Sequence, residues 1–195
     1  MAKRKVASGR LTGGGLSGES VAKTLKWGLP SAVVLALFAG LCFWPVNVAT
    51  VRLPRENNRL FGAVRTAAGA DIRLRYRHSV EKTMVEGRFT IAPGPVLQAV
   101  ETWMASVGTG LPNTQSARTR REGEWIVVDE GLQPIPGFDF FLSAINKTQV
   151  TVDGAAVPVA ALAPGSVIHL DVEYVHLGQW VFWKYFNIDW RKDRK

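Results

Sequence analysis

The stretch Ile72-Arg-Leu-Arg-Tyr-Arg-His78 alternates apolar and basic side chains and decides the fold. Because successive side chains of a strand point to opposite faces, Ile72, Leu74, Tyr76 and His78 share one face and the arginines share the other. This alternation predicts a strand with one buried face. Similar segments follow, so we predict a mainly β fold, either an antiparallel β-sandwich or a partly open barrel, preceded by one transmembrane helix.

The expected strands are short and separated by turns that contain glycine, proline or aspartate. They lie at residues 51–53, 60–65, 72–78, 85–91, 97–107, 125–128, 149–152, 156–159 and 167–176. Residues 113–123 are expected to form an exposed loop, and residues 135–145 an irregular segment or a short helix. Asp153-Gly154 predicts a two-residue hairpin turn, because these residue types tolerate the backbone that such a turn needs.

The membrane anchor is predicted from Trp27–Val46, which contains no charged residue. As a helix it would span about 30 Å, the thickness of a hydrocarbon core. Basic residues outnumber acidic ones six to one before Trp27, so the positive-inside rule keeps the amino terminus in the cytoplasm. The apolar run exceeds the about 7 to 15 residues of a signal peptide, and Asn47-Val48-Ala49 is a poor cleavage site, which favours an uncleaved anchor.

We therefore expect four segments along the chain. Residues 1–24 form a disordered basic cytoplasmic tail, because they contain too few apolar residues to build a core. Residues 25–48 form the transmembrane anchor and residues 49–178 an extracytoplasmic β domain. Residues 179–195 form an aromatic and basic segment at the carboxyl terminus.

The composition argues against several classes of ligand. The net charge is +8, but residues 1–26 carry an excess of five basic residues and residues 184–195 an excess of three, so the rest is neutral and no nucleic-acid partner is expected. No Walker loop or GxGxxG motif is present, and we expect no cofactor. His169 and His176 fall on opposite faces of one strand, so no metal site is expected. Cys42, the only cysteine, lies in the anchor and cannot form an intrachain disulfide.

The candidate site follows from the register of the hairpin after the opening strand. Pairing Tyr76 with Phe89 aligns the apolar faces of both strands, and a slip of one residue would expose them. The same register predicts His78 opposite Gly87, and the next hairpin predicts Glu101 opposite Gly87 from the other side. His78, Gly87 and Glu101 are thus expected in one inward-facing row across three strands.

Three interpretations of this row stay open. An ionised Glu101 in an apolar interior needs a partner, and a hydrogen bond to His78 is the simplest one. The gap over Gly87 could instead hold a small ligand or anion. The third interpretation is an acid/base site on His78 and Glu101. The candidate ligand-binding residues are Tyr76, His78, Glu101, Gly108 and Gly110.

Structural roles are expected for Gly87, Arg77 and Glu86. The predicted register places Glu86 beside Arg77 on the polar face, where an exposed ion pair contributes about 0 to 1 kcal/mol. Ser79 cannot use His78 as a base, because neighbouring strand residues point to opposite faces, and no catalytic residues are assigned.

The segment Trp180–Trp190 contains six aromatic residues and is followed by a basic run. It is too short and too polar for a second membrane crossing. It could lie at the membrane interface, with aromatic rings at headgroup depth and cations on lipid phosphates. It could equally pack on the sheet as a last strand, or dock on another membrane protein.

The motifs around the candidate site resemble a family of bacterial domains, number eighteen-fifty in the series of domains of unknown function. The resemblance spans residues 72–171 and is strongest in 76–112, although Met84 replaces a common proline and Gly87 a common acid. It rests on Tyr76-x-His78-Ser79-Val80-Glu81-Lys82-Thr83, Glu86, Phe89, Glu101-Thr102 and Gly108-x-Gly110-Leu111-Pro112.

This resemblance implies an accessory role beside TRAP-type (tripartite ATP-independent periplasmic) transporters of the TAXI class. We expect a single-pass protein of the bacterial inner membrane with its β domain in the periplasm. Its expected partners are membrane lipid and the TRAP permease or TAXI solute-binding protein, through protein contacts or a small ligand. The alternative is an envelope enzyme that uses His78 and Glu101 in acid/base chemistry.

Overall fold

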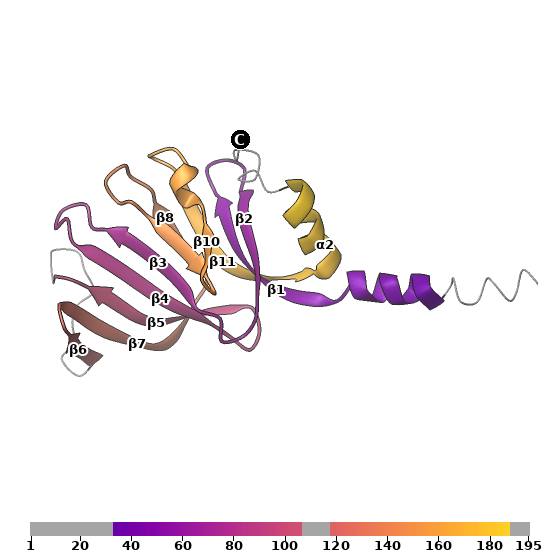
Figure 1. Ribbon diagram of the computed structural model, residues 1–195, viewed down its shortest axis with the longest axis horizontal. Coiled ribbons are helices and arrows are strands. Elements are labelled where there is room, and N and C mark those ends of the chain that lie inside the picture. The colour runs from indigo at the N-terminus through magenta and orange to yellow at the C-terminus, as the bar shows by residue number, and fades with distance from the viewer. Residues whose placement is uncertain (1–32, 107–117, 188–195) are drawn as a thin grey trace, which may run out of the picture. The chain divides into compact units, whose positions relative to one another are not determined.

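The computed structural model describes residues 33–106 and 118–187 (Figure 1). The chain divides into two units at residues 40 and 41. In the first unit residues 33–40 are helical, and this helix ends at residue 42. Across the described ranges, no helix combines the length and apolar character needed to cross a bilayer. The expected tail and residues 25–32 of the expected anchor lie outside the described residues.

The second unit is mainly β and contains two antiparallel sheets, as the sequence predicted (Figure 1). In the described strands neither sheet closes into a barrel. The four-stranded sheet has the order β2 (Arg59–Thr66), β1 (Pro45–Leu53), β11 (Val167–His176) and β8 (Phe138–Phe141). The seven-stranded sheet has the order β10 (Ala155–Val157), β9 (Gln149–Val152), β3 (Ile72–Arg77), β4 (Met84–Ala92), β5 (Val96–Met104), β7 (Trp125–Ile135) and β6 (Thr119–Glu122).

The two sheets share one hydrophobic core. Its buried members come from strands of both sheets and alternate with outward-facing polar residues, as expected when one face of each sheet is covered. Burial of this apolar surface is the main driving force for folding. Its largest fully buried side chains are Leu53, Ile72, Ile91, Leu97, Ile168 and Leu170.

Three short helical segments accompany the two sheets in the described part of the second unit. The 3-10 helix η2 (Val159–Ala161) lies between β10 and β11. The helix α2 (Leu177–Phe182) follows β11 directly and continues as the π-helical segment η3 (Trp183–Asn187). The suggestion of a last strand after residue 179 is therefore wrong for the described part of that segment.

The start of the β domain also differs from the prediction. Strand β1 begins at Pro45, so residues 45–48 belong to the sheet rather than to the expected anchor at 25–48. Val46 and Val48 face α2 and are buried beneath it, with Trp180 and Trp183 packed against this cluster. In this part of β1 the buried Val46 and Val48 alternate with the exposed Pro45 and the half-buried Asn47. None of these residues is charged, so the segment merges in sequence with the uncharged run before it.

Of the other local predictions, one turn is confirmed and two segments expected to be irregular are strands. Asp153 and Gly154 have φ values of 48° and 76° and connect β9 to β10, which confirms the predicted hairpin turn. Residues 119–122 form β6 and residues 138–141 form β8, where a loop and an irregular segment were expected. Both strands are short and largely polar or exposed, so their alternation was weak.

Candidate functional site

The hairpin between β3 and β4 has a different register from the predicted one. Tyr76 pairs with Val85 rather than Phe89, and Phe89 pairs with Ile72. His78 lies beyond the end of β3, in a loop that runs to Thr83. The predicted and observed registers place the same side chains on the same faces, because they differ by an even number of residues, so the apolar pattern could not distinguish them.

Glu101 is turned away from His78 by a β-bulge. Ala99 pairs with Phe89 as predicted, but the register then shifts and Glu101 pairs with Arg88 instead of Gly87. A bulge adds one residue to a strand and reverses the faces of the residues beyond it. The Glu101 side chain therefore lies on the outer face of the seven-stranded sheet. The predicted inward row and the His78–Glu101 hydrogen bond are wrong.

His78 organises its own loop. Its N–H donates to the carbonyl of Thr83 (2.8 Å), and its carbonyl accepts from the N–H of Lys82 (3.0 Å). Its ring Nδ1 accepts from the N–H of Glu81 (3.3 Å). In this contact Nδ1 is the acceptor, which leaves Nε2 as the ring nitrogen that can donate a proton. His78 thus supports the loop with both backbone and side chain.

The remaining predicted ligand residues are not gathered around a gap. The Tyr76 ring packs against Phe140 at a centroid distance of 4.9 Å, and burial raises the pKa of its phenol. A Cβ on Gly87 would lie 3.0 Å from ring atoms of Phe89, so this ring fills the expected space over the glycine. Gly108 and Gly110 lie outside the described residues.

Arg77 and Glu86 are not paired with each other. Arg77 Nε donates to the carbonyl of Lys82 (2.7 Å), which ties the arginine to the His78 loop. Glu86 instead accepts from Arg88 Nε (2.9 Å) and lies 3.8 Å from Arg73 Nη1. The expected ion pair between Arg77 and Glu86 is therefore wrong, because the true register moves Glu86 opposite Arg75.

Alternating charges cross the outer face of the seven-stranded sheet, and we call this set the outer-face ladder. Acidic and basic side chains alternate from the start of β3 to β6, and each inner carboxylate lies between two guanidinium groups. The contacts are Asp71–Arg73 (2.6 Å), Arg73–Glu86 (3.8 Å), Glu86–Arg88 (2.9 Å), Arg88–Glu101 (3.5 Å), Glu101–Arg120 (2.6 Å) and Arg120–Glu122 (2.6 Å).

Glu101 is a carboxylate of this ladder that combines two hydrogen bonds with two arginine contacts. It accepts hydrogen bonds from Arg120 Nη2 (2.6 Å) and from the indole N–H of Trp103 (2.7 Å). Desolvation alone would raise the pKa of the Glu101 carboxyl, but these hydrogen bonds and the charges of Arg120 and Arg88 outweigh it, so the pKa lies below its ordinary value. Glu101 is therefore a fixed negative charge and is poorly suited to act as a general base near neutral pH.

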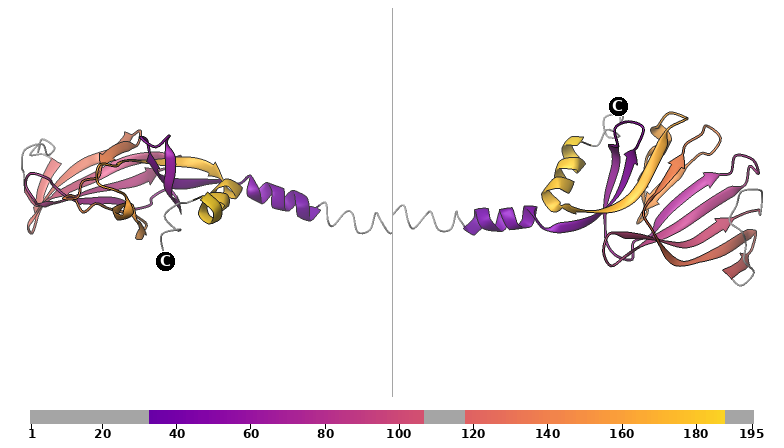
Figure 2. Two further views of the ribbon diagram at one scale, coloured as in Figure 1. Left: turned by 90° about the horizontal axis from the view of Figure 1, so that it is seen from above. Right: turned by 180° about the vertical axis from the view of Figure 1, so that it is seen from behind.

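Trp103 lies at the centre of the ladder. The guanidinium carbon of Arg88 is 3.9 Å from its ring centroid, within cation–π range. The ring of Trp125 meets Trp103 edge to face at a centroid distance of 6.2 Å. These contacts hold a large aromatic side chain in one orientation on an outer sheet face. In the described part of the chain no helix covers this face, and α2 lies against the other sheet (Figure 2).

The structure also brings together a polar cluster that sequence reasoning missed, which we call the His169 groove. It is an open hollow of about 410 Å³ on the four-stranded sheet. His169 Nδ1 is 2.6 Å from Asp139 Oδ1 on β8, and its Nε2 is 4.0 Å from Asp171 Oδ2. Arg52 on β1 donates two hydrogen bonds to the Glu173 carboxylate, at 2.8 and 3.0 Å.

Glu173 is a fixed charge at one side of the groove. Thr50 is fully buried and its hydroxyl donates to Glu173 Oε1 (2.9 Å). Burial raises the pKa of the Glu173 carboxyl, but the hydrogen bonds from Arg52 and Thr50 lower it more, so the pKa lies below its ordinary value. Within residues 33–106 and 118–187, no three His, Cys, Asp or Glu side chains are placed to hold a metal ion.

The sequence held a partial signal for this groove. His169, Asp171 and Glu173 fall on the polar face of an alternating strand, which is visible without a structure. Asp139 and Arg52 lie 30 and 117 residues before His169 in the chain, and only the pairing of β11 with β8 and β1 brings them to it.

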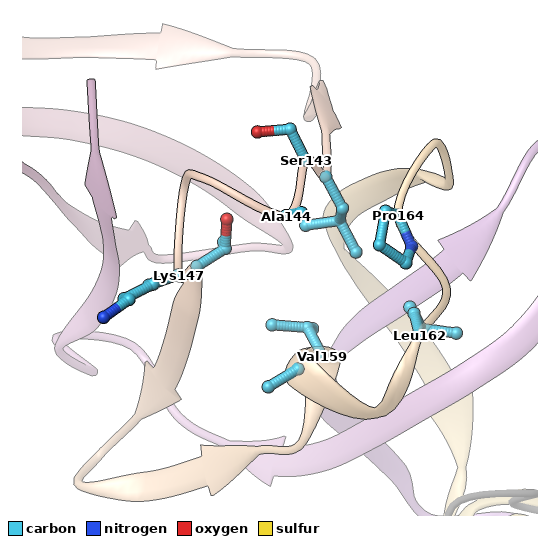
Figure 3. Close-up of a pocket in the computed structure, with 9 residues that line it drawn as sticks. Ser143, Ala144, Lys147, Val159, Leu162 and Pro164 are labelled. Atoms are coloured by element: carbon cyan, nitrogen blue, oxygen red, sulfur yellow. The ribbon is translucent and has the colours of Figure 1, made fainter. Parts of the chain in front are cut away.

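A second hollow, of about 180 Å³, lies between the β8–β9 loop and the η2 segment (Figure 3). Val159, Leu162 and Pro164 supply apolar surface, and the amino group of Lys147 points away from them (Figure 3). The Ser143 hydroxyl is used in a bond to Asn146 Oδ1 (2.7 Å). Polar groups do not converge here as a ligand site requires, so it is a weaker candidate than the His169 groove.

Comparison with known proteins finds one family. Residues 72–159 match the family model described as Domain of unknown function (DUF1850), from the first residue of β3 to the first residue of η2. The match confirms the family resemblance of the motif around His78. No curated protein and no solved structure matches the chain.

Proposed function

Because residues 72–159 belong to the DUF1850 family, we propose that this chain is an accessory protein that acts beside a TAXI-class TRAP transporter through protein contacts. In this proposal the uncharged stretch that begins at Trp27, whose described part is helical to residue 42, forms one transmembrane helix that holds the protein in the bacterial inner membrane. The two sheets form an antiparallel β-sandwich in the periplasm. The proposal assigns no catalytic role to the chain.

The observation that carries the proposal is the Arg88–Trp103 stack on an open sheet face. Tryptophan and arginine are the residues most enriched among binding hot spots, and such anchors work best when they are rigid. Trp103 is fixed by Arg88 above it, by Trp125 at its edge and by its hydrogen bond to Glu101. The charges around it are already paired within the protein. A partner can therefore bind there without ordering long side chains.

The enzyme alternative loses its geometric support. It required His78 and Glu101 to line one cleft, whereas Glu101 lies on the outer face with Arg120 and His78 is bonded within its loop.

A small ligand in the His169 groove is the second candidate function. It is favoured by His169, whose Nδ1 is held by Asp139 while Nε2 faces Asp171 in an open hollow. If this candidate is right, Asp171→Asn impairs transport without weakening association with the permease.

The test is co-purification of the full chain with the TRAP permease from mild detergent. Trp103→Ala and Arg88→Ala should each reduce recovery of the permease, since truncating a hot spot costs about 2 kcal/mol or more, roughly thirty-fold in affinity. Arg59→Ala is the matched control, because Arg59, the first residue of β2, pairs with Glu56 of the exposed β1–β2 turn on the other sheet. Circular dichroism checks that each variant is folded. Wild-type recovery by both folded variants, or no recovery of any transporter subunit by the wild type, contradicts the proposal.

A further inference from the structure

The segment formed by α2 and η3 is apolar on two sides. One side packs on the four-stranded sheet, where Leu177, Trp180 and Trp183 contact the buried cluster that includes Val46 and Val48. This contact explains why the segment is helical, since it covers the outer face of β1 with residues spaced three apart. It does not explain the apolar residues on its other side.

That other side is exposed and aromatic. Phe182, Tyr185 and Phe186 are between 53% and 73% exposed, and Val181 is also exposed. The rings of Phe182 and Phe186 stack on each other at a centroid distance of 5.6 Å. A helix in water normally turns charged or polar residues outward, and one that is apolar on all sides is normally buried. Within the described residues, Phe182 and Phe186 keep more than half of their surface exposed on this side.

The location of the segment indicates what covers it. The N–H of Leu177 donates to the carbonyl of Trp44 (2.8 Å), and His176 Nδ1 lies 3.0 Å from the carbonyl of Phe43. Gly178 approaches the backbone of Cys42 so closely that a Cβ would lie 3.3 Å from its carbonyl oxygen. The helix therefore begins against the end of the uncharged stretch at 27–46, where Phe43 and Trp44 are exposed as well.

The charges of the segment fit a lipid surface. Lys184 Nζ lies 4.8 Å from the ring centroid of Trp180 and 5.7 Å from that of Tyr185. The remaining sequence adds four basic residues after position 190 and only two acidic residues after position 187. Aromatic rings at headgroup depth with cations on anionic lipid phosphates are the usual composition of interfacial helices.

We propose that α2 and η3 lie in the headgroup region of the membrane, with Phe182, Tyr185 and Phe186 inserted beside the anchor. This inference rests on the anchor of the proposed function and adds a second attachment. An anchor alone leaves a domain free to rotate about one connection. A second contact through α2, which is packed on β1, fixes which face of the β domain meets the bilayer.

The test uses the full chain with Cys42→Ser in vesicles of phosphatidylcholine and phosphatidylglycerol. A single cysteine introduced by Phe186→Cys carries an environment-sensitive fluorophore. Matched labels are introduced by Leu132→Cys, at an exposed position of β7, and by Leu35→Cys within the uncharged stretch. Quenching is measured with spin-labelled lipids and with aqueous iodide.

We expect the Phe186→Cys label to be quenched by lipid spin labels near the headgroups, and several-fold less by iodide than the Leu132→Cys label. The inference is overturned, and the anchor left intact, if the Leu35→Cys label is quenched by lipid while iodide quenches the Phe186→Cys and Leu132→Cys labels equally. Protection of Phe186→Cys from both quenchers also overturns it, because protein rather than lipid then covers the segment. No lipid quenching at Leu35→Cys removes the anchor, and this inference with it.

Discussion

Replacing Arg52 by alanine is expected to lower the free energy of unfolding by about 2 kcal/mol at neutral pH. Arg52 donates two hydrogen bonds to Glu173, and the two side chains are only 20% and 31% exposed. Losing one partner of a fully buried pair costs about 3 to 5 kcal/mol, and an exposed pair contributes about 0 to 1 kcal/mol. The intermediate exposure of this pair places the expected loss between these limits.

The pH dependence tests the same reasoning. The pKa of Glu173 is lowered in the folded protein, so its stabilising contribution is complete above the unfolded value of about 4.3 and is lost as the pH falls through the folded value. Arg52→Ala removes the hydrogen bonds that most lower the pKa of Glu173, so desolvation raises this pKa in the variant. Protonation of Glu173 at low pH removes the unpaired, partly buried charge from the variant. The difference in free energy of unfolding between wild type and variant therefore becomes smaller in acid.

The assay is urea unfolding of the detergent-solubilised full chain, followed by tryptophan fluorescence at pH about 7 and about 4. Arg59→Ala is the control for losing an arginine from an exposed pair and should change stability by less than about 1 kcal/mol. The reasoning is refuted if Arg52→Ala is as stable as the wild type, or if its loss of stability is the same at both pH values.

Three further substitutions and one control probe the packing and a turn. Gly87→Ala should cost about 1 to 3 kcal/mol in the same unfolding assay, because its Cβ would press on the Phe89 ring at 3.0 Å, and an unchanged midpoint would contradict this packing. Ile168→Ala should lower the free energy of unfolding by about 2 to 5 kcal/mol, because Ile168 is fully buried. Ile145→Ala, at an exposed position, should change it by less than about 0.5 kcal/mol. Equal losses would be inconsistent with the described core. Gly154→Ala should cost about 1 kcal/mol because φ is 76° there, and thermal unfolding would show a lowered midpoint, while a raised one would argue against the turn.

The alternation of apolar and polar residues was insufficient to predict which side chains meet at the candidate site. Alternation correctly assigned Tyr76 and Phe89 to the inner face, and the pairing of Ala99 with Phe89 was also correct. It could not give the register, because any even shift preserves the faces. It could not give the bulge before Glu101 either, since one extra residue leaves little trace in a sequence. These two errors separated His78 from Glu101.

The sequence by itself determined the mainly β fold, the Asp153-Gly154 turn and the family of residues 72–159. These depend on local periodicity, on backbone preferences of a few residues and on short motifs, all of which are readable in order along the chain. Only the tertiary structure decided which side chains meet. The outer-face ladder joins residues of separate strands, and the His169 groove joins Arg52 on β1 to His169 on β11. Strand pairing sets such distances, because it brings together backbone hydrogen-bonding groups that are far apart in the chain.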